Sequence, residues 1–320
     1  NMTVIDKFEQ LKSYLDTQIL GQPELTHSML ICLLADGHIL VEGPPGLAKT
    51  RAIKSLADGI EGDFHRVQFT PDLLPADLTG TDIYRPETHE FEFQKGPLFH
   101  NLILADEINR APAKVQSALL EAMAERQITV GRTTYQLPDL FLVMATQNPI
   151  EQEGTYPLPE AQLDRFLMHV AIDYPGAEVE REILALNRNE ALAKDSITAP
   201  NLTQEEIVSA RNACLEIYLA PQLEEYIVQI IMATRRPESI DPQLTNWITF
   251  GASPRATIAL ERCARARAWL HGRDFVSPED IISVTPNILR HRLLLSYEAE
   301  SEGISPSMVV DKILTMVAVP

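Results

Sequence analysis

The chain has 320 residues, of which 45% are hydrophobic and 22% charged, ordinary proportions for a folded globular protein with room for two domains. Its 27 basic and 45 acidic side chains give a formal net charge of −18, so repulsion from phosphodiester argues against a non-specific nucleic-acid coat protein, although net charge does not exclude a local basic groove. Three widely spaced cysteines give neither a disulfide framework nor a zinc spacing, and no uncharged apolar run approaches the ~20 residues that span a bilayer. We therefore expect a cytoplasmic protein without membrane insertion.

The first half of the chain has the pattern of an α/β domain. Residues 4–36 show the apolar spacing of two amphipathic helices separated at Gly21-Gln22-Pro23. From residue 38 onward, short apolar runs alternate with helical stretches, which predicts the buried strands of a parallel sheet. These runs are 39–41, 67–69, 102–104 and 141–144.

Two segments interrupt this alternation. Residues 70–97 form a Pro-, Asp- and Thr-rich insert, and residues 127–137 surround a Gly131-Arg132 turn typical of a hairpin. After residue 174 the helical periodicity takes over, with Ser-Pro helix starts at 253 and 277. The sequence therefore predicts an α/β domain over 2–180, with a parallel sheet covered by helices on both faces, and a small all-helical domain over 200–320.

The segment after the first predicted strand has the pattern of a phosphate-binding loop, G-x-x-x-x-G-K-[ST]. Such a loop needs glycine so that backbone N–H groups can converge on phosphate oxygens at the start of a helix. Lys49 is then expected to reach the β- and γ-phosphates, and the Thr50 hydroxyl to ligate Mg²⁺. Ala48 replaces a glycine of the pattern, which is sterically acceptable if its backbone is already helical. The expected nucleotide-binding residues are Gly43, Pro44, Pro45, Gly46, Leu47, Ala48, Lys49 and Thr50.

An apolar strand over 102–104 leads into the acidic pair Asp106-Glu107. Because ligands bind at the carboxyl ends of parallel strands, this pair can face the phosphate loop. Asp106 would hold the Mg²⁺ hydration shell, and Glu107 would polarise the attacking water. The alternative is a solvent-facing pair or a helix cap.

The last of the four runs is followed by Thr146-Gln147-Asn148-Pro149. The amide of Asn148, at the end of a buried strand, could orient the lytic water or the γ-phosphate. Asn-Pro is also a common turn signal, so a purely structural turn is the alternative.

Two arginines are candidates for contact with phosphate. Arg165 can supply charge to a developing γ-phosphate, although an ion pair with Asp164 explains it equally well. Arg255 lies in the first turn of a predicted helix, where a cation opposes the helix dipole unless an anion compensates. That anion could be a nucleotide phosphate or a nearby carboxylate. We expect Arg262, Arg265 and Arg267 to form a solvated or subunit-contact face.

Taken together, these motifs resemble the MoxR family of AAA+ ATPases over essentially the whole chain, in the family's order. The matching segments are 43–50, 104–111, 145–149, 163–166 and 251–256. The resemblance implies a P-loop NTPase (AAA+) core followed by a helical lid, with residues 70–97 as the insert typical of the clade. Ala48 is the form usual in this family.

The resemblance also implies a role for each candidate residue. Lys49 and Thr50 match Walker A, Asp106 and Glu107 match Walker B, and Asn148 matches sensor 1. Arg165 matches the arginine finger offered to a neighbouring subunit, and Arg255 matches sensor 2. Leu20 and Gly21 lie in the segment that packs against adenine.

Three further expectations follow from the family. It implies Mg²⁺ and ATP at the interfaces of a hexameric ring, a protein client that is matured or receives a metal, and a partner with a von Willebrand factor A domain. The leading hypothesis is thus an ATP-hydrolysing remodelling chaperone. Alternatives are a nucleotide-gated scaffold with little hydrolysis, a magnesium-chelatase-like motor subunit and a nucleic-acid motor, the last opposed by the charge of −18.

Overall fold

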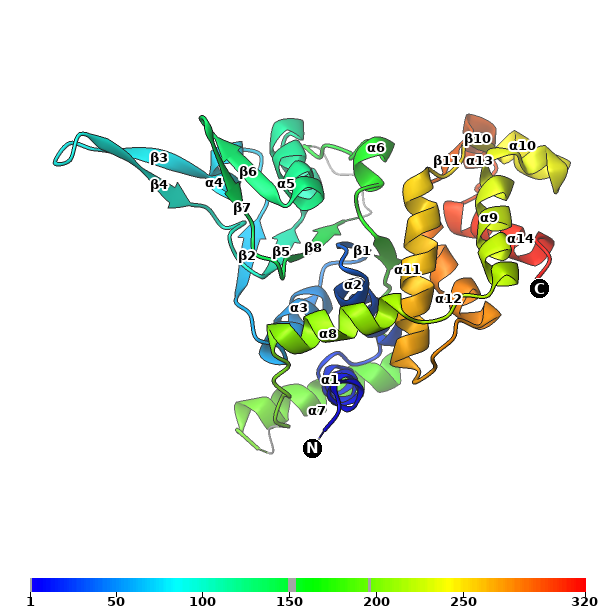
Figure 1. Ribbon diagram of the computed structural model, residues 1–320, viewed down its shortest axis with the longest axis horizontal. Helices are drawn as coiled ribbons and strands as arrows, with labels where there is room; N and C mark the ends of the chain where they lie inside the picture. Colours follow the sequence, from blue (N-terminus) through cyan, green and yellow to red (C-terminus); the bar gives the residue numbers. More distant parts are fainter. Residues whose placement is uncertain (1, 149–153, 195–196) are drawn as a thin grey trace. The chain divides into compact units, whose positions relative to one another are not determined.

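The computed structural model describes residues 2–148, 154–194 and 197–320 (Figure 1). The chain forms two compact units, each described here by itself. The first unit comprises Asn1–Leu30, His38–Leu158 and Val170–Glu206, and the second comprises Ile31–Gly37, Pro159–His169 and Ile207–Pro320.

A five-stranded sheet forms the centre of the first unit, in the order β2-β5-β8-β1-β9. The pairs β2–β5, β5–β8 and β8–β1 are parallel, as the runs of apolar residues predict. The register places Gln68 opposite Asp106 and Glu42 opposite Gln147, so the ends of these strands meet at one edge. The strands are β1 (Ile39–Glu42), β2 (Phe64–Gln68), β5 (Leu102–Asp106), β8 (Leu142–Gln147) and β9 (Met168–Ala171).

The outer strands differ most from the sequence prediction. β2 begins at Phe64, three residues before the predicted run, because only Val67 of this edge strand is buried and its other side chains break the apolar pattern. β9 was not predicted. β1 and β5 match the predicted runs because both are buried on two faces.

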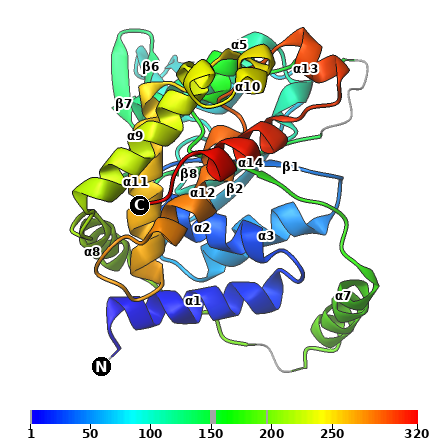
Figure 2. The ribbon, with the colours of Figure 1, turned by 90° about the vertical axis from the view of Figure 1, so that its right-hand side faces the viewer.

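Helices pack against this sheet in layers, with α3 between β5 and α1 (Figure 2). α1 starts with a capping box in which the Thr3 hydroxyl accepts from the Asp6 N–H, and it buries Phe8, Leu11 and Leu15. The elements up to residue 191 are α1 (Val4–Gln18), α2 (Pro23–Ala35), α3 (Leu47–Asp58), α4 (Pro75–Thr79), the 3₁₀ turn η1 (Ile108–Arg110), α5 (Ala113–Glu125), α6 (Glu160–Leu163) and α7 (Ala177–Ala191).

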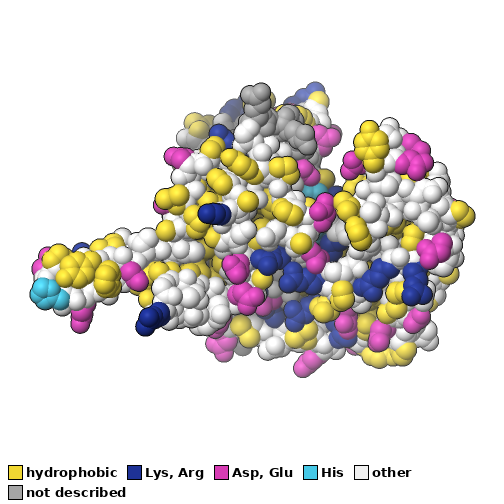
Figure 3. Space-filling model, turned by 90° about the horizontal axis from the view of Figure 1, so that it is seen from above, with side chains coloured by type: hydrophobic (Ala, Val, Ile, Leu, Met, Phe, Trp, Pro, Cys, Tyr) yellow, Lys and Arg dark blue, Asp and Glu magenta, His cyan; other side chains and the backbone are white. Residues whose placement is uncertain are grey.

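Two antiparallel hairpins project from the first unit (Figure 1). One pairs β3 (Gly80–Arg85) with β4 (Glu90–Lys95), and the other pairs β6 (Gln127–Val130) with β7 (Thr133–Gln136). They are joined by a stacked pair of rings, Phe93 and Tyr135, whose centroids lie 4.0 Å apart. Towards its tip the longer hairpin exposes Tyr84 and Phe91, and apolar side chains are visible along it in Figure 3.

The second unit is helical apart from the short antiparallel pair β10–β11, which the all-helical prediction did not include. Its principal contact is between α11 and α12. The elements after residue 200 are α8 (Gln204–Leu215), α9 (Pro221–Arg235), η2 (Pro237–Ser239), α10 (Pro242–Trp247), β10 (Ile248–Phe250), α11 (Pro254–Leu270), α12 (Pro278–Leu289), β11 (Leu294–Leu295), α13 (Tyr297–Ser301) and α14 (Pro306–Met316). No helix in the described part of the chain is long and apolar enough to cross a membrane.

The arginines of α11 correct one expectation. Arg262 is exposed, but Arg265 donates to the carbonyl oxygens of Leu215 and Ile217 at 2.7 and 2.8 Å. Arg267 donates to Asp280, a carboxylate with no exposed surface, at 2.7 Å. The prediction of a solvated or subunit-contact face is therefore wrong for Arg265 and Arg267, which hold the helices of the second unit together.

Candidate functional site

The loop between β1 and α3 has one closely packed glycine and one that faces open space. Gly43 cannot be replaced without movement, because a Cβ there would lie 2.4 Å from Cγ1 and 2.7 Å from the carbonyl oxygen of Ile172. A Cβ at Gly46 would meet nothing within 4 Å, so the loop is open on that side. α3 begins at Leu47, so Ala48 already has a helical backbone and the departure from glycine carries no steric penalty.

Lys49 projects from the first turn of α3 back onto its own loop. Its Nζ donates to the carbonyl oxygen of Gly43 at 2.8 Å, and the residue is 8% exposed. Burial lowers the pKa of Lys49, while the negative charges of Asp106, Glu107 and Glu42 oppose that shift. An ammonium has three N–H donors, and this contact uses one of them. The lysine is therefore placed between a loop that can hold an anion and a group of carboxylates.

Asp106 ends β5, and its two carboxylate oxygens have different partners. Oδ1 accepts from the Thr146 hydroxyl at 2.7 Å, and Oδ2 accepts from a guanidinium N–H of Arg66 at 2.6 Å. The side chain of Asp106 is only 16% exposed, whereas that of Arg66 is 49% exposed. The carboxylate is thus fixed on one side by a neighbouring strand and paired on the other with a cation that solvent reaches.

Glu107 follows directly, with a left-handed backbone at φ 55° and ψ 56°. This conformation is unfavourable for a residue with a Cβ, and such strain is concentrated at functional sites. The Glu107 N–H donates to the Thr146 hydroxyl at 2.9 Å, and its carboxylate lies 3.5 Å from a guanidinium nitrogen of Arg110. The Thr146 hydroxyl therefore positions both members of the acidic pair.

Asn148 lies at the same edge, immediately after β8. Its carbonyl oxygen accepts from the Asn109 side chain at 3.4 Å, and the preceding Gln147 donates to Glu42 at 3.4 Å. Pro149, which completes the motif, lies outside the described residues. The polar ends of β1, β5 and β8 thus meet beside the loop, as the sequence predicts.

The segment expected to contact adenine has an independent structural reason for its glycine. Gly21 has φ +73°, and a Cβ there would lie 2.6 Å from Cγ1 of Val179 in α7. Leu20 precedes it in the turn between α1 and α2, and Gln22 donates to the carbonyl oxygen of Asp173 at 3.1 Å. The contacts of this turn with α7 and Asp173 are thus enough to account for its glycine, and an adenine role for Leu20 and Gly21 stays a prediction.

The two candidate arginines belong to the second unit. Arg165 is half-buried and follows Asp164, and Arg255 is exposed in the first turn of α11. The sequence also allowed an ion pair between Arg165 and Asp164. The Asp164 carboxylate instead accepts from Arg292 at 2.7 Å and from the Ser253 hydroxyl at 2.8 Å. The residues that the structure brings together at the sheet edge are therefore those of the first unit.

Sequence reasoning missed two side chains at this edge, Arg66 and the Thr146 hydroxyl. Thr146 lies within the polar segment that ends the predicted strand, and this position at the carboxyl end was the signal that could have found it. Arg66 carries no local signal, because its contact depends on the register between β2 and β5, 40 residues apart in sequence.

The donor set at the edge fits a hydrated magnesium ion. No group of three or more His, Cys, Asp or Glu side chains that could hold a metal occurs among the described residues. Mg²⁺ needs no such cage, because it binds through one or two protein oxygens and takes the rest from water and substrate phosphates. The Asp106 carboxylate lies at this edge as one such oxygen, and a role for the Thr50 hydroxyl stays a prediction.

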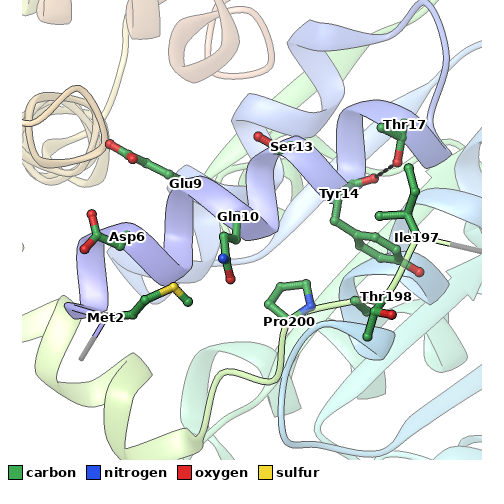
Figure 4. A pocket seen from close by; sticks show the side chains of 11 residues that line it. Met2, Asp6, Glu9, Gln10, Ser13, Tyr14, Thr17, Ile197, Thr198 and Pro200 are labelled. Carbon is green, nitrogen blue, oxygen red and sulfur yellow. Dashed lines mark hydrogen bonds between the residues drawn. The ribbon is translucent and has the colours of Figure 1, made fainter.

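A separate groove lies between α1 and residues 197–200 and has a volume of about 750 Å³ (Figure 4). Asp6 and Glu9 are among its lining residues, and no lysine or arginine is. An acidic lining repels a triphosphate, so this groove is not the nucleotide site.

Comparison with known proteins gives a consistent result over both parts of the chain. Residues 38–168 match the ATPase family associated with various cellular activities (AAA), and residues 246–313 match the AAA lid domain. The chain is 48% identical to the chaperone MoxR1 of Mycobacterium tuberculosis, over 94% of this chain and 79% of the relative. It is 33% identical to the protein MoxR of Paracoccus denitrificans, over 98% and 96%. A crystal structure of a presumed ATPase from Cytophaga hutchinsonii is similar with a TM-score of 0.91 and 45% identity, over 99% of this chain and 96% of that one.

Proposed function

The chain belongs to the MoxR family of AAA+ ATPases, and on that premise we propose that it hydrolyses Mg-ATP to remodel a client protein. The observation that carries the proposal is the convergence of Lys49, Asp106 and Glu107 at the carboxyl edge of the sheet, beside an open glycine loop. Such a group of residues is what phosphoryl transfer to water requires.

The loop and the lysine bind the triphosphate in this proposal. Backbone N–H groups of Gly43, Gly46, Leu47 and Ala48 and the Lys49 ammonium provide donors to phosphate oxygens, since Pro44 and Pro45 have no N–H. The bound anion then becomes a further partner of that buried cation. Thr50 and Asp106 would hold the Mg²⁺, which would supply charge stabilisation to the phosphates.

Glu107 is the residue that polarises the attacking water. Its left-handed backbone turns the side chain away from the strand direction, and the Thr146 hydroxyl fixes that turn through the Glu107 N–H. Asn148 orients the water or the γ-phosphate from the end of β8. Thr146 thereby links the magnesium-binding carboxylate to the water-activating one, which favours a fixed spacing between them.

Arg165 and Arg255 complete the site in a ring. We assign Arg165 to the nucleotide of a neighbouring subunit and Arg255 to the nucleotide of its own subunit, in a hexamer of the AAA+ type. Leu20 and Gly21 pack against adenine. The nucleotide-binding domain comprises residues 2–180 and the lid 200–320. The proposal is completed by a cytoplasmic location of this protein, a protein client that is matured or receives a metal, and a partner with a von Willebrand factor A domain.

Phosphate release measured with and without Mg²⁺, together with the sedimentation of the chain in the presence of ATP, tests this proposal. We expect Mg²⁺-dependent release and assembly into rings. A chain that binds ATP, stays monomeric and releases phosphate at the background rate would instead be a nucleotide-gated scaffold.

Mixing two variants with strongly reduced but measurable turnover tests the assignment of Arg165. Arg165→Ala subunits keep Glu107, and Glu107→Gln subunits keep Arg165, so an equal mixture creates competent interfaces at about one quarter of the positions in a ring. Turnover restored by mixing supports an arginine supplied by a neighbour. A mixture as inactive as its components would contradict it.

A further inference from the structure

The serine at the start of α11 does not cap its helix. Ser253 has the extended backbone of an N-cap residue, but its hydroxyl makes no hydrogen bond to the N–H groups of the first turn. It donates instead to Oδ2 of Asp164 at 2.8 Å. By contrast, Ser305 at the start of α14 accepts from the N–H of Met308 at 3.2 Å, as an N-cap serine ordinarily does.

Asp164 therefore joins two segments that lie 89 residues apart in the sequence. It immediately precedes Arg165. It also accepts from Ser253, the N-cap residue of α11, and the first turn of that helix contains Arg255. Its other carboxylate oxygen accepts from Nε of Arg292 at 2.7 Å. One carboxylate thus links the backbone of both arginines that we assign to phosphate.

Arg292 fixes this arrangement from the end of α12. Its side chain is only 3% exposed, and the desolvation of the guanidinium lowers its pKa while Asp164 opposes that shift. Besides the carboxylate, the guanidinium donates to the carbonyl oxygens of Asp164, Phe166, Leu167 and Ile288. The ring of the adjacent His291 also makes a hydrogen bond of 2.8 Å to the carbonyl oxygen of Phe166.

A guanidinium with this many backbone partners specifies one conformation of the chain. Its fork of five N–H groups is planar and rigid, so segment 164–167 cannot shift without breaking several bonds in a dry environment. The Ser253 hydroxyl donates to Asp164 and makes no capping hydrogen bond to the first turn of α11.

We infer that Asp164, held by Arg292 and Ser253, is a positioning residue that makes the segment of Arg165 and the first turn of α11 a single rigid element. Arg165 and Arg255 consequently move together, so that the state of one nucleotide affects the arginine presented to the next. This inference rests on the proposed function and deepens it.

Steady-state kinetics of a variant at Ser253 test this link, because the substitution leaves the buried guanidinium of Arg292 in place. Ser253→Ala removes only the bond from α11 to Asp164, and Ser253→Thr keeps a hydroxyl there. We expect Ser253→Ala to lower kcat by about threefold to thirtyfold and to reduce the Hill coefficient for ATP, because small misplacements of catalytic groups are costly. Ser253→Thr restores both, and Ser305→Ala, which removes a true cap, changes neither although it lowers the thermal stability.

Double variants separate positioning from simple loss of structure. In an Arg165→Ala background, Ser253→Ala should lower kcat by a smaller factor than in the wild type, because only its effect on Arg255 remains, while any change in the melting temperature persists. The same factor of loss in both backgrounds would overturn the inference, and so would wild-type kcat and Hill coefficient in Ser253→Ala. A wild-type chain without Mg²⁺-dependent phosphate release removes the proposed function instead, and the inference with it.

Discussion

Acidic and basic side chains cluster at two places, the carboxyl edge of the sheet in the first unit and the contact between α11 and α12 in the second. The two clusters differ in how far solvent reaches the paired side chains. At the edge, Asp106 is paired with Arg66, whose guanidinium is half-exposed. Within the second unit, Asp280 has no exposed surface and accepts from Arg267, Arg273 and the Ser277 N–H.

Because of this difference in exposure, Asp106 can exchange its partner, whereas Asp280 cannot. An ion pair with an exposed member contributes little to stability, so a ligand can replace that member at small cost. A fully buried carboxylate that loses its partners leaves uncompensated charge in a dry environment. The edge is therefore suited to binding a changing ligand, and the charges of the second unit are suited to holding one structure.

The largest effect should come from breaking the buried group. Asp280→Ala removes the carboxylate that neutralises Arg267 and Arg273, and we expect it to lower the free energy of unfolding by about 3–5 kcal/mol. Urea denaturation followed by circular dichroism measures this. The control is Glu261→Ala, which removes the partly exposed pair with Arg265 and should cost about 0–1 kcal/mol. Equal losses in the two variants would mean that burial does not distinguish them.

At the sheet edge the largest effect should be on ligand binding. Lys49→Ala removes the buried ammonium from the loop, and we expect ATP binding to weaken about a hundredfold with little loss of stability. Lys54→Ala, in the same helix but exposed, is the matched control. Titration with a fluorescent ATP analogue gives both affinities, and a Lys49→Ala variant with wild-type affinity would rule out the loop as the site.

A smaller effect should follow from removing the exchangeable cation. Arg66→Gln leaves Asp106 without its positive partner, so Mg²⁺ no longer competes with a guanidinium. We expect the Mg²⁺ concentration for half-maximal turnover to fall about twofold to fivefold. Arg85→Gln, which removes the exposed pair with Glu92, should leave it unchanged. A higher Mg²⁺ requirement in Arg66→Gln would show that Arg66 assists binding instead of opposing it.

The smallest expected effect is on the pH dependence of the free energy of unfolding. Burial raises the pKa of Asp280, but the hydrogen bonds from Arg273, Ser277 and Arg267 outweigh it, and the net pKa is below the ordinary 3.8. A depressed folded pKa gives stability that is complete above the unfolded pKa of about 4 and is lost as the pH falls through the folded value. Unfolding free energies of the wild-type chain should therefore fall more steeply below about pH 4 than those of Asp280→Asn. Parallel curves would contradict this.

The features that could be predicted from sequence are those that a local pattern of neighbouring residues encodes. β1 and β5 are buried on both faces and therefore form apolar runs, and the loop of 43–50 carries its own pattern. The edge strand β2 lacks such a run, because only Val67 of its five residues is buried. The pair β10–β11 is too short, at three and two residues, to give a strand pattern.

The contacts that could not be predicted join residues far apart in the chain. Arg66 and Thr146 each reach Asp106 across 40 residues of sequence, through a strand register that no local pattern encodes. Arg265 and Arg267 are charged, so the sequence alone favours solvent for both. Only the position of Asp280 and of the carbonyl oxygens at the end of α8 shows that they point inward.

The most direct test of the central claim is to measure ATP binding and turnover in one variant, Glu107→Gln. If Glu107 polarises the attacking water while Lys49 and Asp106 hold the nucleotide, the variant binds Mg-ATP within about threefold of the wild-type affinity and releases phosphate about 10²–10⁴ times more slowly. Phosphate release within about twofold of the wild-type rate would contradict the account.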